Sequence, residues 1–126
     1  MSIVQNGKIS IANLGDSCGF IISKKGIMRK ITVDHTPNRV DERERIINNN
    51  GFITNKGGVS RVDGEIAVSR AIGDKNLKQY LISEPEVFSC QITDEDDLLI
   101  LSTDGIFLVY KEQQLASMIF EMRQSG

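Results

Sequence analysis

Asp104 is the side chain of this sequence best placed to do chemistry, because it lies where the apolar run Asp97–Ser102 ends, with one residue between them. Such a run is typical of a strand buried on both faces. An ionised carboxylate at the end of a buried strand is costly unless it is hydrogen-bonded or bound to a cation. Gly105 beside it has no Cβ, which would let an ion or water approach the backbone. Asp104 is therefore a candidate cation ligand, or else a cap on the following segment, residues 106–110.

Asp16 lies in a short break between two expected strands, in the run Asn13–Gly19. An aspartate at such a place is commonly a turn or bulge residue. A functional role is the alternative. The acidic cluster 94–97 lacks the alternating ligand spacing and the glycine of a calcium loop, so it is interpreted as a solvated turn.

Two arginines and the single histidine are the remaining candidates. Arg61 and Arg70 flank the turn Asp63-Gly64 and could bind a phosphate group bidentately. The commoner role for such arginines is an ion pair, and the acidic candidates for it are Asp74, Glu65 and Glu84. His35 could act as a general acid, although a loop histidine held by its neighbour Asp34 is the simpler interpretation.

Composition narrows the class of protein. With 126 residues, 40% hydrophobic and 25% charged, the chain is expected to form one globular domain. The formal net charge is -2 and the basic residues are scattered, so neither nucleic acid nor an anionic membrane is an expected partner. Cys18 and Cys90 do not form a metal-binding or disulfide pattern. Without a signal peptide in this sequence, a cytoplasmic location is expected, with the nucleus as the alternative.

The expected elements indicate an α+β fold. Asn6-Gly7 favours a tight hairpin turn, and the segments 19–22 and 27–33 extend it into an antiparallel meander in one sheet. The spacing of Val40, Arg43, Ile46 and Ile47 predicts a short surface helix over 40–47 with a single apolar edge, stopped at Gly51. Strands are expected at 87–92 and 98–101, joined as a hairpin by the acidic turn. A helix is expected at 112–122, with an apolar stripe of Leu115, Met118, Ile119 and Met122.

Six ordered motifs resemble the metal-dependent serine/threonine protein phosphatases of the type 2C family. The segments that carry the resemblance are Ala12–Ser17 (Ala-Asn-x-Gly-Asp-Ser), Val33–Pro37 (Asp-His-x-Pro), Glu42–Ile46 with Gly51, Arg61–Asp74, Glu84–Glu86 and Leu99–Ile106. The resemblance implies part of an α-β-β-α sandwich, in which two antiparallel sheets are flanked by helices. It also implies hydrolysis of phosphoserine or phosphothreonine in a phosphoprotein substrate by a water activated by two Mg²⁺ or Mn²⁺ ions, which needs no protein nucleophile.

The same resemblance implies roles for individual residues. Asp104 matches a ligand of the catalytic metal pair, and Asp16 matches a carboxylate associated with a further, weaker metal. A second group matches an invariant framework near the site, to which we assign support rather than chemistry: Arg61, Ser69, Arg70, Asp74 and Gly105. No catalytic residue proper is assigned.

The departures from the family pattern matter as much. The Asp-Gly-His-Gly-Gly segment, expected before residue 1, and a later Asp-Asn segment, expected after Gly126, do not occur in this sequence. The family's Asp-Gly-Ile-Trp-Asp becomes Asp104–Leu108, which replaces a carboxylate by an apolar side chain. Residues 1–126 are therefore expected to be an incomplete catalytic domain that is inactive alone. The alternative is a pseudophosphatase or regulatory binding module that keeps the fold, and exposed sheet edges predict a homodimer.

Overall fold

The computed structural model describes residues 1–125 and divides the chain into two compact units. The first unit contains residues 1–13, 17–33 and the segment from Val87 onward. The second contains residues 14–16 and 34–86. Neither unit is a continuous stretch of chain. Among residues 1–125, the structure has no helix that is both long and apolar enough to cross a membrane.

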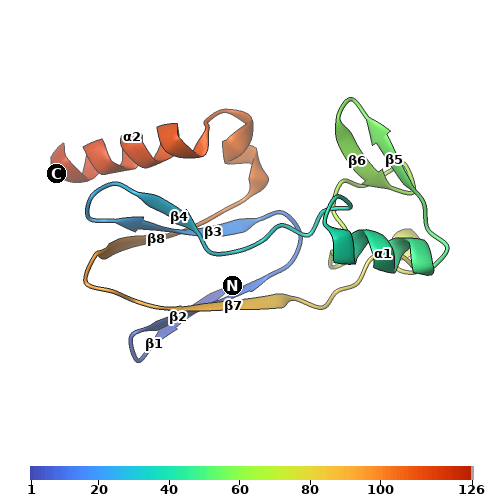
Figure 1. Cartoon of the computed structure of the whole chain (residues 1–126), viewed down its shortest axis with the longest axis horizontal. Coiled ribbons are helices and arrows are strands. Elements are labelled where there is room, and N and C mark those ends of the chain that lie inside the picture. The colour runs from blue at the N-terminus through green and yellow to red at the C-terminus, as the bar shows by residue number, and fades with distance from the viewer. Residues whose placement is uncertain (126) are drawn as a thin grey trace. The chain divides into compact units, whose positions relative to one another are not determined.

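The first unit is built on two three-stranded sheets, and the α+β class predicted from the sequence is confirmed (Figure 1). One sheet has the strand order β1-β2-β7, and the other has the order β4-β3-β8. The strands are β1 (Ser2–Gln5), β2 (Lys8–Asn13), β3 (Cys18–Ser23), β4 (Met28–Lys30), β7 (Glu86–Gln91) and β8 (Asp96–Ser102).

Local turn chemistry explains the first hairpin. Asn6 and Gly7 have φ angles of 53° and 70°, and Gln5 pairs with Lys8 across the turn, as the Asn-Gly signal predicted. The predicted single-sheet meander is wrong, because β2 and β3 belong to different sheets. β3 pairs instead with β4 and with β8, which follows it by more than 70 residues. Sequence proximity therefore did not decide the pairing.

The core of the first unit lies between the two sheets. Ile9 and Ile11 from β2 pack with Ile21 from β3, and Leu99 from β8 contacts the same cluster. On the opposite face of β3, the Phe20 ring lies 5.3 Å from the Phe107 ring, measured between centroids. Both faces of the β3 strand are thus covered.

The strand buried on both faces is β3, and the prediction that gave this place to residues 98–101 is wrong. Residues 18–22 are all buried. β8 lies at the edge of its sheet and is only partly buried, and Leu101 is 47% exposed. An edge strand is paired on one side, which leaves the other side of its backbone open. The homodimer expected from such edges stays a prediction.

The acidic turn does not close a hairpin, because β7 and β8 belong to different sheets. The turn is local: the Asp96 carboxylate accepts hydrogen bonds from the backbone N–H and the hydroxyl of Thr93, at 2.9 and 3.1 Å. An aspartate commonly makes such bonds to nearby backbone. The segment therefore carries the chain from one sheet to the other.

The second helix, α2 (Glu112–Ser125), is confirmed and lies along the β4-β3-β8 sheet (Figure 1). Phe120 of this helix lies against Gly26, where a Cβ would come within 2.9 Å of the ring. Leu115 and Ala116 are buried, but Met118 and Met122 are exposed. The predicted apolar stripe is therefore buried only at its N-terminal end.

The second unit contains the helix α1 (Val40–Asn48), the hairpin β5 (Ile53–Lys56) and β6 (Val59–Val62), and the 3-10 helix η1 (Lys75–Leu77). The predicted helix is confirmed, and of its predicted apolar edge only Ile46 is buried. Val40 and Ile47 are exposed, whereas Glu42 and Ile46 are buried. The unit's apolar core is a cluster of Ile46, Val62, Leu77 and Leu81.

The end of α1 shows why a glycine follows it. Asn50, with φ of 61°, adopts the left-handed conformation. The N–H groups of Asn50 and Gly51 donate to the carbonyls of Ile47 and Ile46, each at 2.9 Å, the hydrogen-bond pattern of a Schellman motif. The predicted stop suggested that Gly51 supplies the positive φ, but Asn50 supplies it instead. Gly51 allows close packing, because a Cβ there would lie 2.8 Å from Ile46 Cγ2 and from Tyr80 Cδ1.

We expect Gly51→Ala to lower the free energy of unfolding by about 1–3 kcal/mol, the usual cost of forcing an extra carbon into packed surroundings. Chemical denaturation followed by circular dichroism measures it. Gly105→Ala is the matched control, because the nearest atom to its new Cβ is Thr103 Oγ1 at 3.7 Å. Equal stability of the two variants would contradict the packing explanation.

Candidate functional site

Asp104 lies where the sequence placed it, just beyond β8, and its surroundings are open. It is the first residue of the 3-10 helix η2 (Asp104–Leu108), and its side chain is exposed. The N-cap position belongs to Thr103, so the alternative that Asp104 caps this segment is wrong. An exposed carboxylate with space beside it at Gly105 can receive a cation without repacking the fold.

Asp16 belongs to the second unit and is half-buried. The residue before it, Gly15, is buried with φ of 84°. Gly15 makes two hydrogen bonds with His35: the His35 N–H donates to the Gly15 carbonyl at 2.9 Å, and the Gly15 N–H donates to His35 Nδ1 at 3.2 Å. The turn that carries Asp16 is thus attached to the rest of its unit through its neighbour.

Ser69 and Arg70 converge on a buried carboxylate, Glu42 of α1. The Ser69 hydroxyl donates to Glu42 Oε2 at 2.5 Å, and Arg70 donates to Oε1 through Nε and Nη2, at 2.9 and 2.6 Å. Arg45 adds a third partner at 2.6 Å. The framework role assigned to Ser69 and Arg70 agrees with this geometry. Arg70 reaches Glu84 only through the main-chain carbonyl, so its predicted acidic partner is replaced by Glu42.

Burial raises the pKa of the Glu42 carboxyl, but hydrogen bonds from Arg70, Ser69 and Arg45 outweigh burial and bring the pKa to about 2. Glu42 is therefore ionised at neutral pH. Its charge is balanced inside the protein by two guanidinium groups, which are themselves bound to main-chain carbonyls of Tyr80, Ser69 and Glu84. The charged groups of this cluster are therefore bound to one another and to the backbone, as in a structural centre.

Arg61 and Asp74 are separate from this cluster. Arg61 donates to the main-chain carbonyl of Glu65 at 2.6 Å, which holds the turn after β6 and does not involve the predicted carboxylate. Asp74 is exposed in the left-handed conformation, φ 49°, immediately before η1. Arg61 thus holds a turn and Asp74 lies beside η1, and the supporting role of both stays a prediction.

His35 is fully buried, so it cannot act as a general acid on a bound substrate in this conformation. Its Nε2 lies 3.1 Å from Glu86 Oε2, whereas the sequence pointed to Asp34 as its partner. Glu86 is held in turn by Arg39, whose Nη1 and Nη2 donate to its two oxygens at 2.6 and 3.2 Å. Burial and the nearby positive charge of Arg70 lower the pKa of His35, against the opposing effect of Glu86.

Among residues 1–125, no three histidine, cysteine, aspartate or glutamate side chains gather as a metal site. Asp16 and Asp104 fall in different units. The residues described do not by themselves fit the two-metal centre that the family resemblance implies.

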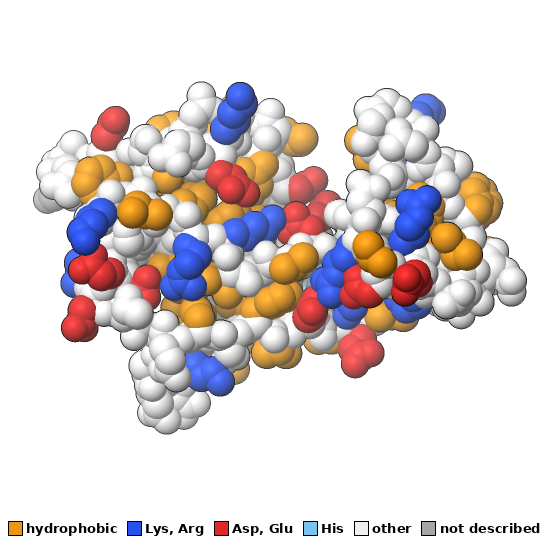
Figure 2. Space-filling view, viewed as in Figure 1, with side chains coloured by type: hydrophobic (Ala, Val, Ile, Leu, Met, Phe, Trp, Pro, Cys, Tyr) orange, Lys and Arg blue, Asp and Glu red, His pale blue; other side chains and the backbone are white. Residues whose placement is uncertain are grey.

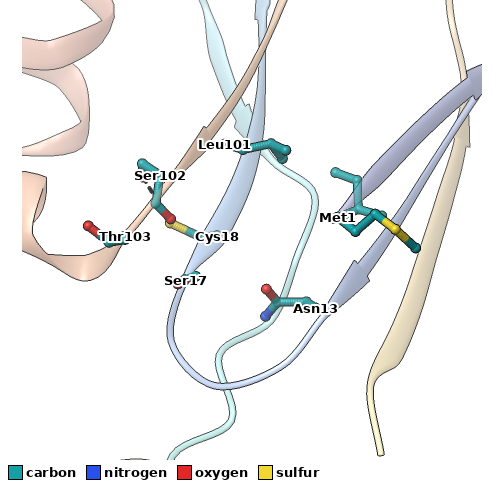
Figure 3. Close-up of a pocket in the computed structure, with 8 residues that line it drawn as sticks. Met1, Asn13, Ser17, Cys18, Leu101, Ser102 and Thr103 are labelled. Carbon is teal, nitrogen blue, oxygen red and sulfur yellow. Dashed lines mark hydrogen bonds between the residues drawn. The ribbon is translucent and has the colours of Figure 1, made fainter. Parts of the chain in front are cut away.

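A pocket of about 270 Å³ opens in the first unit between the ends of β2, β3 and β8 (Figure 3). Cys18 and Ser102, paired across β3 and β8, line it with their side chains in contact, Sγ to Oγ 3.5 Å. None of its eight lining side chains is acidic or basic. The pocket therefore offers no carboxylate, imidazole or lysine side chain for acid–base chemistry.

Comparison with known proteins identifies the family. The family model described as protein phosphatase 2C matches residues 1–126. The chain belongs to the protein phosphatase 2C family. It is 48% identical to the probable protein phosphatase 2C 17 of Arabidopsis thaliana over 115 residues, which are 90% of this chain and 40% of that protein. It is 42% identical to the probable protein phosphatase 2C 62 of Oryza sativa, of which it covers 39%. The chain thus spans about 40% of the length of these curated relatives.

Solved structures agree. The serine-threonine phosphatase 2C of Toxoplasma gondii matches with a TM-score of 0.84 and 27% identity over 99% of this chain and 46% of that one. A sex determining protein of C. elegans matches with a TM-score of 0.83 and 32% identity, over 90% of this chain and 28% of that one. The protein phosphatase 2C architecture is therefore present in both units of the chain.

Sequence reasoning missed two carboxylates of this protein phosphatase 2C chain. Glu42 was noted only as part of a motif, and Glu86 only as part of Glu84–Glu86, yet each receives at least one arginine. A signal existed for Glu42: it lies four residues before the buried Ile46, which places both on one face of α1. The face shown in Figure 2 does not single out these two carboxylates, because acidic and basic side chains are interspersed over it.

We expect Glu42→Gln to lower the free energy of unfolding by about 3–5 kcal/mol, because it leaves two arginines without their buried counter-charge. Urea denaturation at neutral pH measures the change. Glu44→Gln is the matched control: it lies on the same helix, is exposed, and should change stability by less than about 0.5 kcal/mol. A small effect of Glu42→Gln would show that the charge itself is not needed.

Acidification should destabilise the fold through His35. Because its folded-state pKa is lowered, the folded protein binds fewer protons at this site than the unfolded chain once the pH falls below the ordinary value of 6.5. The free energy of unfolding should therefore decline from about pH 6.5 downward, before the carboxylates titrate. Denaturation midpoints between pH 5 and 7.5 would show this slope, and His35→Asn should flatten it. An equal slope in both proteins would contradict the assignment.

Proposed function

We propose that this chain is part of the catalytic domain of a protein serine/threonine phosphatase that hydrolyses phosphoserine or phosphothreonine in protein substrates. The observation that carries the proposal is the family match across residues 1–126. The Toxoplasma relative is a serine-threonine phosphatase 2C, which supports the substrate class. Dependence on Mg²⁺ or Mn²⁺ follows from the same resemblance.

In this proposal Asp104 supplies one carboxylate of the metal centre and Asp16 supplies a carboxylate to a further, weaker metal. The remaining ligands come from parts of the domain outside residues 1–126. Its exposure at the end of β8 supports this role, because a carboxylate without a buried position is free to face added groups. The chain alone is then inactive. Ser69, Arg70 and Glu42 hold the second unit together and do not take part in the reaction.

The second candidate is a pseudophosphatase or regulatory binding module. One observation favours it: Leu108, where the family motif has an aspartate, is 84% exposed. An apolar side chain at that place cannot ligate a cation. By the family resemblance, the aspartate that Leu108 replaces would join Asp16 at the further, weaker metal, so the change leaves Asp104 in place.

A chimera tests the proposal, in which residues 1–126 replace the matching part of the Arabidopsis relative. We expect metal-dependent hydrolysis of a phosphothreonine peptide, reduced roughly 100-fold or more by Asp104→Asn, the usual size for losing one electrostatic stabiliser of a transition state. Asp94→Asn, in the exposed acidic turn, should leave the rate unchanged. The isolated chain should show no turnover with or without Mn²⁺.

Two results would contradict the proposal. A chimera that folds, by circular dichroism, yet is inactive would favour the binding module. Turnover by the isolated chain, lost in Asp104→Asn, would show that the added segments are dispensable.

A further inference from the structure

His35 forms hydrogen bonds through its backbone and through both ring nitrogens, and two of these bonds are to Gly15. The N–H and Nδ1 of His35 bind the carbonyl and the N–H of Gly15, the His35 carbonyl accepts from the Ser69 N–H at 2.9 Å, and its Nε2 contacts Glu86. All of these groups lie in the second unit. Because both backbone groups of Gly15 bind the same residue, the Gly15 peptide groups are held in orientation as well as in position.

The hydrogen bonds select one form of the ring. Since Nδ1 accepts the Gly15 N–H, it carries no proton, and a neutral imidazole then carries its proton on Nε2. That proton points at the Glu86 carboxylate. Arg39 holds both oxygens of Glu86 and is itself bound by Asp41. The chain of contacts from Asp41 to His35 therefore fixes the tautomer that the Gly15 turn requires.

The turn needs a glycine at position 15. Its φ of 84° is unfavourable for other residues. The next residue is Asp16, whose side chain projects from the same turn. Fixing the Gly15 backbone thus limits the directions in which the Asp16 carboxylate can point.

We propose that His35, held as the Nε2–H tautomer by Glu86 and Arg39, is a positioning residue for the Asp16 carboxylate. His35 acts through the Gly15 backbone and touches no substrate, since it is fully buried. The inference rests on the proposed function, which places Asp16 in the site. It assigns the family's Asp-His-x-Pro segment, here Asp34–Pro37, a role in organising that site.

Nitrogen-15 NMR of the isolated chain tests the tautomer, and amide hydrogen exchange tests the clamp. The imidazole shifts should show an unprotonated Nδ1 and a protonated Nε2. His35→Leu keeps a side chain of similar volume but removes the Nδ1 acceptor, so the Gly15 amide should exchange about tenfold faster. His35→Asn places an oxygen near the position of Nδ1 and should restore most of the Gly15 protection.

Leu81→Ala is the matched control, because Leu81 is buried in the apolar core of the same unit. Leu81→Ala should speed hydrogen exchange of all amides of the second unit to a similar extent. His35→Leu should speed exchange of the Gly15 amide more than that of the other amides. In the chimera, His35→Leu should reduce the phosphatase rate and His35→Asn should retain most of it.

Each failure has its own signature. The proposed hold of His35 on Gly15 is contradicted if Nδ1 is protonated. It is also contradicted if the Gly15 amide loses no more protection than the other amides of the unit. Both results count whether or not the chimera is active. Activity unchanged in His35→Leu overturns the positioning role while the proposed function stands. An inactive chimera with an intact clamp overturns both the proposed function and the role given to Asp16, and leaves His35 a structural residue.

Discussion

The buried carboxylate of Glu42 is the constraint on which the second unit depends. Taking an ionised carboxylate out of water costs several kcal/mol unless every oxygen is satisfied. Here Ser69 and two arginines meet that need. The arginines then bind the carbonyls of Ser69, Tyr80 and Glu84. One charge on α1 thereby fixes segments that regular secondary structure does not hold, and the small apolar core packs beneath them.

Ser69 joins this network to the one around His35. Its hydroxyl donates to Glu42, its carbonyl accepts from Arg45, and its N–H donates to the His35 carbonyl. A disturbance at Glu42 therefore reaches His35 through a single residue, and from there the turn at Gly15. The motif Arg61–Asp74, which dominates the sequence, acts in this unit mainly as scaffolding: it supplies Ser69 and Arg70 to the buried carboxylate and places no acid or base in a cavity.

Local chemistry was predictable and long-range pairing was not. Asn6-Gly7 specifies its hairpin because the two left-handed residues suffice, and both helices follow from spacing within a few residues. The burial of β3 rather than β8 depends on which strand lies in the middle of a sheet, and no local pattern encodes that order. The partners of Arg70 and His35 were missed for the same reason: Glu42 and Glu86 are distant in sequence, while the acidic neighbours chosen instead were close.

The charges of this chain fall into two groups with different duties. Glu42 and Glu86 are satisfied by arginines inside the second unit, so they are committed to the fold. Asp104 is exposed at the end of a strand and is not needed for packing. Such a carboxylate can change without unfolding the protein, and the same holds for position 108, where an exposed leucine has replaced an acid. Because the scaffold and the exposed acids are separate, substitutions in this family can remove the reaction while the architecture persists. Asp104 itself is retained, so the change at position 108 does not remove the carboxylate on which the proposed function rests.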